Sequence, residues 1–294
     1  EQHKFGVKQR IELSKKGGED CDILLMSATP IPRTLIMTLY GDMDVTRIIE
    51  KPIKKNETIT LSKPEEKIDE IILFIKKQIQ NQNQIFWVCP LIEESKKLDY
   101  SAAIKKFDLL SKKFPNKVGL IHGGLEKSEK NTVLNKFLGK KIDLLVSTTV
   151  IEVGIDFPNA NVIVIENSNK FGLSQLHQLR GRVGRGQKQG TCILLYKKNL
   201  SDNAKKRIKI LKETNDGFLI AEEDMKLRGF GDILGFQQSG IKNFKLADPI
   251  QHEELFKIAE KNIKEIELNE NNFKKYDFII RLFDKAQIIN EIIT

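Results

Sequence analysis

The chain has few cysteines, few aromatic residues and no long apolar run, and these shortages exclude several classes of protein. Only 7% of its 294 residues are aromatic, and its three cysteines form no Cys-x-x-Cys pair. Neither a disulfide framework nor a zinc site is therefore expected. Each cysteine adjoins an apolar, strand-like run, so we predict small core residues at Cys21, Cys89 and Cys192. No apolar run approaches the roughly 20 residues that cross a membrane, and no secretory leader is expected, which favours a cytoplasmic protein.

Acidic residues are also in deficit, with 40 against 49 lysines and arginines, giving a net charge of +9 and a pI near 9.2. The chain is 40% hydrophobic and 30% charged, which is typical of a globular protein long enough for two domains. A basic excess favours an anionic partner, and nucleic acid is the first candidate. Lysine, isoleucine and asparagine are used heavily throughout, as an AT-biased codon supply would produce, so charge alone does not establish that partner.

Short apolar runs alternate with amphipathic stretches between about residues 20 and 215. This alternation predicts an α/β fold with βαβ units on a parallel sheet. The expected strands are Asp22–Met26, Gln84–Cys89, Lys117–Ile121, Asp143–Ser147, Asn161–Ile165 and Thr191–Leu195. The expected helices between them are Glu65–Gln80, Ser95–Phe114, Ser128–Leu138 and Leu173–Val183.

The pattern also predicts how the chain divides. Residues 1–50 are expected to end one α/β domain, and residues 63–200 to form a second, with Pro52 and polar neighbours marking a linker at 51–62. Two helices are then expected, at Ser201–Asn215, with Ser201 as N-cap, and at Phe218–Leu227. A glycine-rich loop follows, so that 201–240 forms a helical hairpin and loop, and 241–294 a lysine-rich helical extension.

The segment Gln175–Gly186, QLHQLRGRVGRG, is the most informative in the chain. As one continuous helix it would place Gln178, Arg182 and Arg185 on one face. The opposite face would pack on a core through Leu176, Leu179 and Val183, while Gly181 and Gly184 would allow close approach. Arginine forks suit phosphate oxygens and can neutralise charge on a transferred γ-phosphoryl group. A basic segment that holds a nucleic acid backbone, or a merely solvated helix, remains an alternative.

Small polar residues follow three of the expected strands. Ser27 and Thr29 end the first, where they could link a nucleotide site to a second site or simply cap a helix. Thr148 and Thr149 offer hydroxyl and amide groups for an anion.

Three further positions are candidates. Gly154 allows close backbone approach, and Asp156 could accept a hydrogen bond from a ribose hydroxyl or orient an arginine. His122 could meet a backbone phosphate, although a histidine at a strand end is more often structural.

Read in order, these segments resemble the motifs of superfamily 2 helicases, and most closely those of the RecG family. The resemblance extends over residues 1 to about 240. It rests on EQHKFGVKQR, SATPIPRTL, WVCPLIEES, GLIHGGL, TTVIEVGIDFPNA, FGLSQLHQLRGRVGRG, and NDGF followed by LRGFGDILGFQQSG. It implies a second RecA-like helicase lobe preceded by the tail of a first lobe. It also implies ATP hydrolysis with Mg²⁺ and action on duplex and branched DNA (forks and Holliday junctions), by an enzyme expected to be monomeric.

The resemblance also implies roles for individual residues. Those implied at the site of ATP hydrolysis are Glu1 as general base and the arginine-finger residues Gln178, Arg182 and Arg185. Those implied beside the nucleotide are Gly154 and Asp156. Those implied in coupling hydrolysis to movement are His3, Ser27 and Thr29. Those implied in DNA contact are His122, Thr148 and Thr149, with Arg228 and Gln238 in the translocation loop.

Two departures from the family pattern limit what the chain can do. The sequence contains no Gly-x-x-x-x-Gly-Lys-Ser/Thr phosphate loop, and no Asp precedes Glu1. We therefore expect the chain to start inside the DExH box of a longer enzyme whose first lobe holds most of the ATP and Mg²⁺ contacts. These residues are also expected to lack the family's amino-terminal wedge domain. The chain alone is expected to be inactive as an ATPase, and no metal site is expected within it.

Two alternatives remain at this stage. The chain could be a non-catalytic protein that clamps duplex nucleic acid, or it could come from a transcription-repair coupling factor, which shares the glycine-rich loop. EQH and VIEVGID, where coupling factors tend to carry EEH and IIETGID, favour the RecG family. A smaller departure is Phe236–Gln237, where relatives more often carry Thr-Arg, so a basic contact at Gln237 is not expected.

Overall fold

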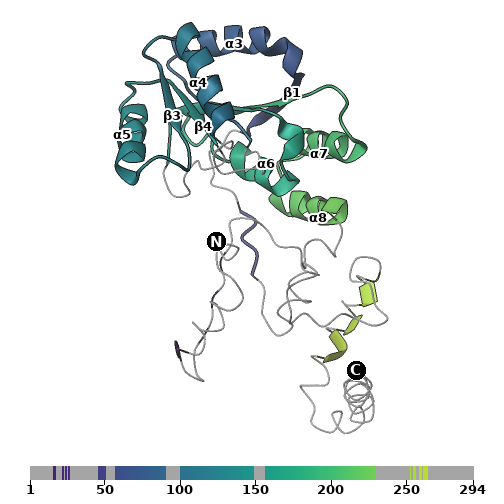
Figure 1. Ribbon diagram of the computed structural model, residues 1–294. Helices are drawn as coiled ribbons and strands as arrows, with labels where there is room; N and C mark the ends of the chain where they lie inside the picture. Colours follow the sequence, from purple (N-terminus) through teal and green to yellow (C-terminus); the bar gives the residue numbers. More distant parts are fainter. Residues whose placement is uncertain are drawn as a thin grey trace, which may run out of the picture. The chain divides into compact units, whose positions relative to one another are not determined.

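In the computed structural model, the chain is described over residues 57–90, 100–148 and 156–228. Short stretches are also described at 16–17, 22, 24, 26, 46–50, 252, 254–255, 258–259 and 261–263. The chain divides into two units, Glu1–Pro32 with Val45–Arg228, and Arg33–Asp44 with Gly229–Thr294. All the labelled helices and strands lie in the first unit (Figure 1). Over these described ranges, no helix has the length and apolarity needed to cross a membrane.

A six-stranded, wholly parallel sheet forms the centre of this unit, with strand order β1-β6-β5-β2-β4-β3 (Figure 1). The strands are β1 (Ile59–Pro64), β2 (Gln84–Val88), β3 (Val118–Ile121), β4 (Leu144–Ser147), β5 (Ala160–Ile165) and β6 (Thr191–Tyr196). β2, β4 and β5 are buried along their whole length, as expected for parallel strands covered on both faces. The predicted α/β fold is confirmed.

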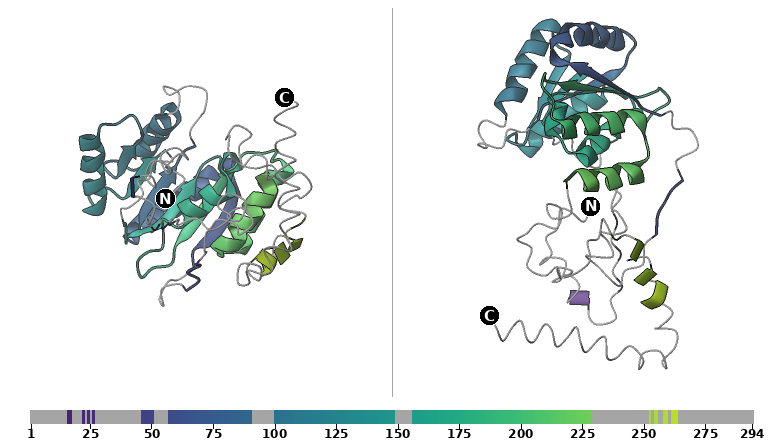
Figure 2. Two further views of the ribbon diagram at one scale, coloured as in Figure 1. Left: turned by 90° about the horizontal axis from the view of Figure 1, so that it is seen from below. Right: turned by 90° about the vertical axis from the view of Figure 1, so that its right-hand side faces the viewer.

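Helices cover both faces of the sheet, which gives three layers (Figures 1 and 2). The helices are α3 (Ile68–Gln80), α4 (Ser101–Lys113), α5 (Lys127–Leu138), α6 (Leu173–Arg180), α7 (Asp202–Glu213) and α8 (Gly217–Arg228), with short 3-10 turns η2 (Glu65–Lys67) and η3 (Ser168–Lys170). Alternate residues of β2 serve the two cores. Ile85 and Trp87 join the cluster under α3 and α4, whereas Phe86 and Val88 join the one under α5 to α8.

One strand was missed by the sequence patterns. β1 occupies residues 59–64, so the second half of the segment expected to be a linker belongs to the sheet, where it pairs with β6. β1 lies at the edge of the sheet and reads ITLSKP, with its residues exposed or half-buried. An edge strand needs no continuous apolar run, and this one therefore lacked the pattern that revealed the other strands.

The arginine-rich segment is not one continuous helix, which corrects the expected range Leu173–Val183. α6 ends at Arg180, Gly181 caps it, and Gly184 adopts a φ of 71°. Glycine is the residue that enters this left-handed region without steric cost. Arg182 and Arg185 therefore lie on the loop after α6, and the expected helical face shared with Gln178 does not form.

Local capping follows the sequence more closely. Ser201 accepts a hydrogen bond from the Ala204 N–H at 3.3 Å and begins α7, as predicted.

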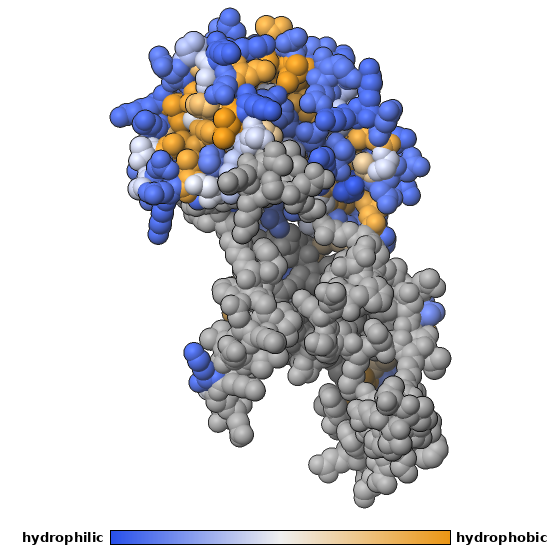
Figure 3. Space-filling model, in the orientation of Figure 1, coloured by the Kyte–Doolittle hydropathy of each residue, from blue (hydrophilic) through white to orange (hydrophobic). Residues whose placement is uncertain are grey.

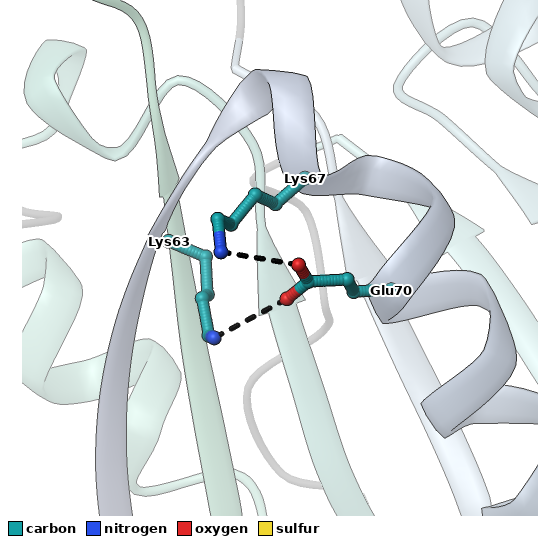
Figure 4. Close-up of polar contacts among 3 residues, drawn as sticks. All are labelled: Lys63, Lys67 and Glu70. Carbon is teal, nitrogen blue, oxygen red and sulfur yellow. Dashed lines mark hydrogen bonds and ion pairs between the residues drawn. The ribbon is translucent and has the colours of Figure 1, made fainter.

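Near the start of α3, Glu70 accepts from both Lys63, at 3.4 Å, and Lys67, at 3.1 Å (Figure 4). The hydrogen bond from Lys67 is the main reason that the pKa of Glu70 is lowered. These side chains are solvated, so their contribution to stability is small.

Among the described cysteines, Cys89 and Cys192 are buried in the two cores, as expected, and burial raises the pKa of Cys192 to about 12.

The described surface is mainly hydrophilic, with apolar side chains interspersed over α4 (Figure 3). Ile104 and Leu109 are the exposed apolar residues of that helix.

Candidate nucleotide and nucleic-acid sites

The predicted site residues that the structure describes include two pairs, which lie at opposite ends of the parallel strands. His122 and Thr148 directly follow β3 and β4, and therefore lie at the carboxyl-terminal ends of the strands, which we call the strand-end edge. Asp156 precedes β5, and the loop that carries Arg185 returns to the first residue of β5, where the Gly184 N–H donates to the Ala160 carbonyl at 3.1 Å. This second pair therefore lies at the amino-terminal ends of the strands, which we call the strand-start edge.

Asp156 and Arg185 contact one another at the strand-start edge. Arg185 Nη1 lies 3.5 Å from Asp156 Oδ1, and Arg185 Nε donates to the Gly181 carbonyl at 3.1 Å. The side chain of Asp156 is 65% exposed and that of Arg185 is 33% exposed. Of the two roles predicted for Asp156, the one visible in this contact is orientation of an arginine, and the guanidinium stays accessible to a phosphate.

Close packing around Gly184 fixes the loop that bears Arg185. A Cβ added at Gly184 would lie 2.9 Å from the Gly190 nitrogen and 3.0 Å from its Cα. Gly184 was predicted to allow the close approach of another surface, and the neighbour found here is the chain's own backbone. Leu176, Leu179 and Val183 are all buried, as predicted, although Val183 lies beyond the helix.

At the strand-end edge, β3 and β4 bring His122 next to Thr148. The Thr148 N–H donates to the Ile121 carbonyl at 3.3 Å, so this amide is already used and does not face an anion freely. Its side chain is buried, and its hydroxyl has no hydrogen-bond partner within the described part of the chain. His122 is half-buried, and burial, together with the charge of Lys130, lowers its pKa.

Three polar side chains that the sequence patterns did not single out tie this lobe together. Arg180 is buried and donates to the carbonyls of Leu211 at 2.6 Å and Thr214 at 2.9 Å, at the end of α7. On α7, Arg207 donates to the Phe171 carbonyl at 2.6 Å. Cations that satisfy the free carbonyls at a helix end stabilise it. A helical reading does place Arg180 four residues after Leu176, on the buried face, and this spacing could have revealed it.

The third of these side chains is Asp224, on α8. It is buried, and it accepts from the Leu173 N–H at 3.1 Å and from Ser174 Oγ at 2.6 Å. Gly172, the residue at the N-cap of α6, has no side chain to do this, so a carboxylate from α8 caps α6 instead. A cap supplied from 50 residues further along leaves no local sequence pattern.

A buried ion pair lies beyond the end of β2 and β5. Lys106 Nζ lies 2.5 Å from Glu166 Oε1, and Cys89 Sγ donates to Glu166 Oε2 at 3.3 Å. The Lys106 ammonium also lies 5.3 Å from the centre of the Trp87 ring. These contacts join α4 to the strand-end edge. Because they come from three separate segments, no sequence spacing predicts them.

Several predicted site residues lie outside the described residues, namely Glu1, His3, Ser27, Thr29, Thr149, Gly154 and Gln238. Arg228 is the last residue of α8, but its side chain is not described. Gln178 is exposed on α6, and Arg182 is half-buried after it. No cluster of three or more His, Cys, Asp or Glu side chains suited to a metal occurs over the described ranges.

Comparison with protein families gives two matches along the chain. Residues 64–187 match the helicase conserved C-terminal domain, and residues 214–287 match the family "ATP-dependent DNA helicase RecG, domain 3, C-terminal". The first match covers β2 to β5 and α3 to α6, and the second begins just before α8. The match to the second family favours RecG over the transcription-repair coupling factors.

Individual relatives agree with this. The chain is 44% identical over 282 residues to the ATP-dependent DNA helicase RecG of Bacillus subtilis, and 46% identical over 270 residues to that of Thermotoga maritima. These alignments cover 95% and 91% of the chain but 41% and 34% of the relatives, so the chain spans well under half of their length.

Solved structures give the same assignment. A structure of RecG bound to a three-way DNA junction is 42% identical, with a TM-score of 0.65, over 87% of this chain and 32% of that one. Dbp5 of S. cerevisiae, bound to RNA and ADP BeF3, has a TM-score of 0.52 at 17% identity over 76% of this chain and 59% of that one, which supports the fold alone. The chain therefore belongs to the RecG family of superfamily 2 helicases and corresponds to the carboxyl-terminal part of its members.

Proposed function

We propose that the chain is the second RecA-like lobe and translocation element of an ATP-dependent DNA helicase of RecG type. The intact enzyme would move on duplex DNA and remodel branched DNA, such as stalled forks and recombination intermediates. Membership of the family and the structure of the relative bound to a three-way DNA junction support this proposal. We further propose that the intact enzyme is cytoplasmic and monomeric. Analytical ultracentrifugation of the intact enzyme would test its oligomeric state.

The observation that carries the proposal is the Asp156–Arg185 pair at one edge of the sheet. An accessible guanidinium held by a carboxylate suits a phosphate oxygen presented from another lobe. Arg185 would form the arginine side of a split ATP site, and we propose that Arg182 and Gln178 also contribute to it. Bound ATP would supply the free energy for movement, and the arginines would stabilise negative charge on its terminal phosphoryl group. Among the described residues, no three carboxylate, imidazole or thiol side chains lie close enough together to hold Mg²⁺.

The opposite edge of the sheet is the proposed surface for DNA. His122 lies there beside Lys130, whose ammonium donates to the Gly123 carbonyl at 3.3 Å. A half-buried histidine and a lysine can both donate hydrogen bonds to the oxygens of backbone phosphates. Such contacts do not depend on the base sequence of the DNA. Thr148 and Thr149 are proposed to contribute next to them, and Arg228 and Gln238 to contact duplex from the loop after α8.

Helix α6 lies between these two edges and would couple them. It starts after the end of β5, and the loop that follows it returns to the start of the same strand. Asp224 fastens its first turn to α8, and Arg180 fastens its last residue to α7. A displacement of α6 caused by phosphate contact would therefore move α7 and α8 as one block.

The proposal is tested by joining the chain to the amino-terminal part of the Bacillus subtilis relative and following ATP-driven strand displacement on a three-way junction. We expect displacement by the joined protein and none by the chain alone, which contains no phosphate loop. Junction binding without displacement or ATP turnover in the joined protein would favour the alternative of a non-catalytic duplex-binding protein.

A further inference from the structure

The aromatic ring of Tyr100 lies flat against His122 at the strand-end edge of the sheet. The two ring centroids are 4.6 Å apart, with an interplanar angle of 26°. Tyr100 immediately precedes α4, and His122 immediately follows β3, so the contact joins two separate connections of the lobe. Stacking of this kind restricts how the imidazole can rotate.

The two residues after His122 make room for this stack. A Cβ added at Gly123 would lie 3.0 Å from Tyr100 Oη, and one added at Gly124 would lie 2.9 Å from Tyr100 Cε2. The tyrosine ring therefore packs on bare backbone, and neither glycine needs a positive φ to explain its presence. A side chain at either glycine would press on the Tyr100 ring, so the position of the ring depends on both glycines.

The same loop determines which imidazole nitrogen carries the proton. The Gly124 N–H donates to His122 Nδ1 at 3.2 Å, and a nitrogen that accepts a hydrogen bond carries no proton. In the neutral ring the proton is then on Nε2. No hydrogen bond to Nε2 occurs among the residues that the structure describes, so this N–H is left for an acceptor outside the lobe.

Burial and the Lys130 ammonium both favour the neutral form of the ring, and the ammonium also favours an anion nearby. The pKa of His122 is lowered by burial and by the Lys130 ammonium, with a smaller opposing effect from Glu129. Lys130 is held on the loop by its bond to the Gly123 carbonyl. The site therefore offers a neutral N–H donor beside a fixed positive charge, which suits an anionic oxygen such as that of a backbone phosphate.

We infer that Tyr100 is a positioning residue which, with the Gly124 N–H, holds His122 as the Nε2–H tautomer so that it donates to a DNA phosphate. The phosphate contact rests on the function proposed above, whereas the tautomer and its dependence on Tyr100 do not. The two parts can therefore fail separately.

The experiment uses the 294-residue chain labelled with ¹⁵N, in which long-range ¹H–¹⁵N spectra report the protonation of each imidazole nitrogen. We expect an unprotonated Nδ1 and a protonated Nε2 for His122 at neutral pH, unchanged in Tyr100→Phe. We expect Tyr100→Ala and Gly124→Ala, which remove or displace the ring, to give mixed tautomers. A circular dichroism spectrum like that of the unsubstituted chain establishes that each variant is folded.

Binding of each variant to a short DNA duplex completes the test. We expect His122→Ala and Tyr100→Ala to weaken binding about three- to tenfold, the range for loss of one solvent-accessible hydrogen bond, and Tyr100→Phe to bind normally. A protonated Nδ1, or an unaltered tautomer in both folded ring variants, would overturn the positioning role. The expected tautomers with full duplex affinity in His122→Ala would overturn the phosphate contact instead.

Discussion

Asp224 on α8 accepts a hydrogen bond from the backbone N–H of Leu173, the first residue of α6. A second bond, from Ser174 Oγ at 2.6 Å, satisfies the other carboxylate oxygen. One buried side chain thus closes the free end of the helix that precedes the candidate arginine loop. It also fixes the position of the helix that precedes the proposed translocation loop.

Replacement of this carboxylate is expected to destabilise the lobe. Asp224→Ala leaves the Leu173 N–H and the Ser174 hydroxyl without their acceptor, at a cost of about 1–2 kcal/mol in the free energy of unfolding. Urea unfolding followed by circular dichroism measures the change. Asp224→Asn keeps one acceptor and should lose less. Glu223→Ala, on the same helix, removes only a partly exposed pair with Lys226 and should change little; equal losses in all three variants would contradict the capping role.

A methyl group at Gly184 is expected to distort the arginine loop. Gly184→Ala combines a positive φ with a Cβ only 2.9 Å from the Gly190 nitrogen, and such strain costs about 1–3 kcal/mol. Gly181→Ala is the matched control, because Gly181 has a φ of −66° and its nearest neighbour would be 3.3 Å away. Thermal unfolding should show a clearly lower Tm for Gly184→Ala than for Gly181→Ala, and the reverse order would refute this account of the loop.

The buried pair of Lys106 and Glu166 should respond differently to single and double replacement. Lys106→Met leaves the Glu166 carboxylate buried without its cation, which typically costs about 3–5 kcal/mol. Adding Glu166→Leu removes the stranded charge, so the double variant should recover much of the loss. Urea unfolding of the two single variants and the double variant gives the coupling free energy. A double variant as unstable as the sum of the singles would show that the two charges do not act as a pair.

Acidification should reduce stability through His122. Because burial lowers its pKa in the folded protein, the unfolded chain binds the proton more readily, and stability that is complete above about pH 6.5 declines as pH falls below that value. The groups around the ring are Tyr100, Lys130 and Glu129. His122→Gln should make the free energy of unfolding less dependent on pH between about pH 7 and pH 5. An identical pH dependence in this variant would remove His122 as the cause.

The sequence predicted the covered strands and missed what depends on distant partners. β2, β4 and β5 are continuous apolar runs, and each was located to within a residue, whereas the edge strand β1 has no such run. The arginine segment was assigned by its helical spacing, yet glycine at 181 and 184 ends the helix first.

Contacts between residues far apart in the sequence explain what the sequence patterns could not predict at the candidate site. Asp156 was expected to accept from a ribose or to orient an arginine, and only the fold shows that Arg185 is within reach, 29 residues away. Asp224 and Arg180 act on helices 50 and 31 residues distant. No local pattern contains that information, because each contact depends on how the helices pack on the sheet.

The central claim is that Arg185 serves an ATP site completed by another lobe. It is tested most directly by the ATP turnover of the chain joined to the amino-terminal part of the Bacillus subtilis relative, in the presence of branched DNA. We predict that Arg185→Ala lowers kcat by about 10³-fold or more while junction affinity and folding are kept, and that Lys76→Ala, at an exposed position on α3, has no effect. Turnover by Arg185→Ala within a few-fold of the unsubstituted protein would contradict the claim.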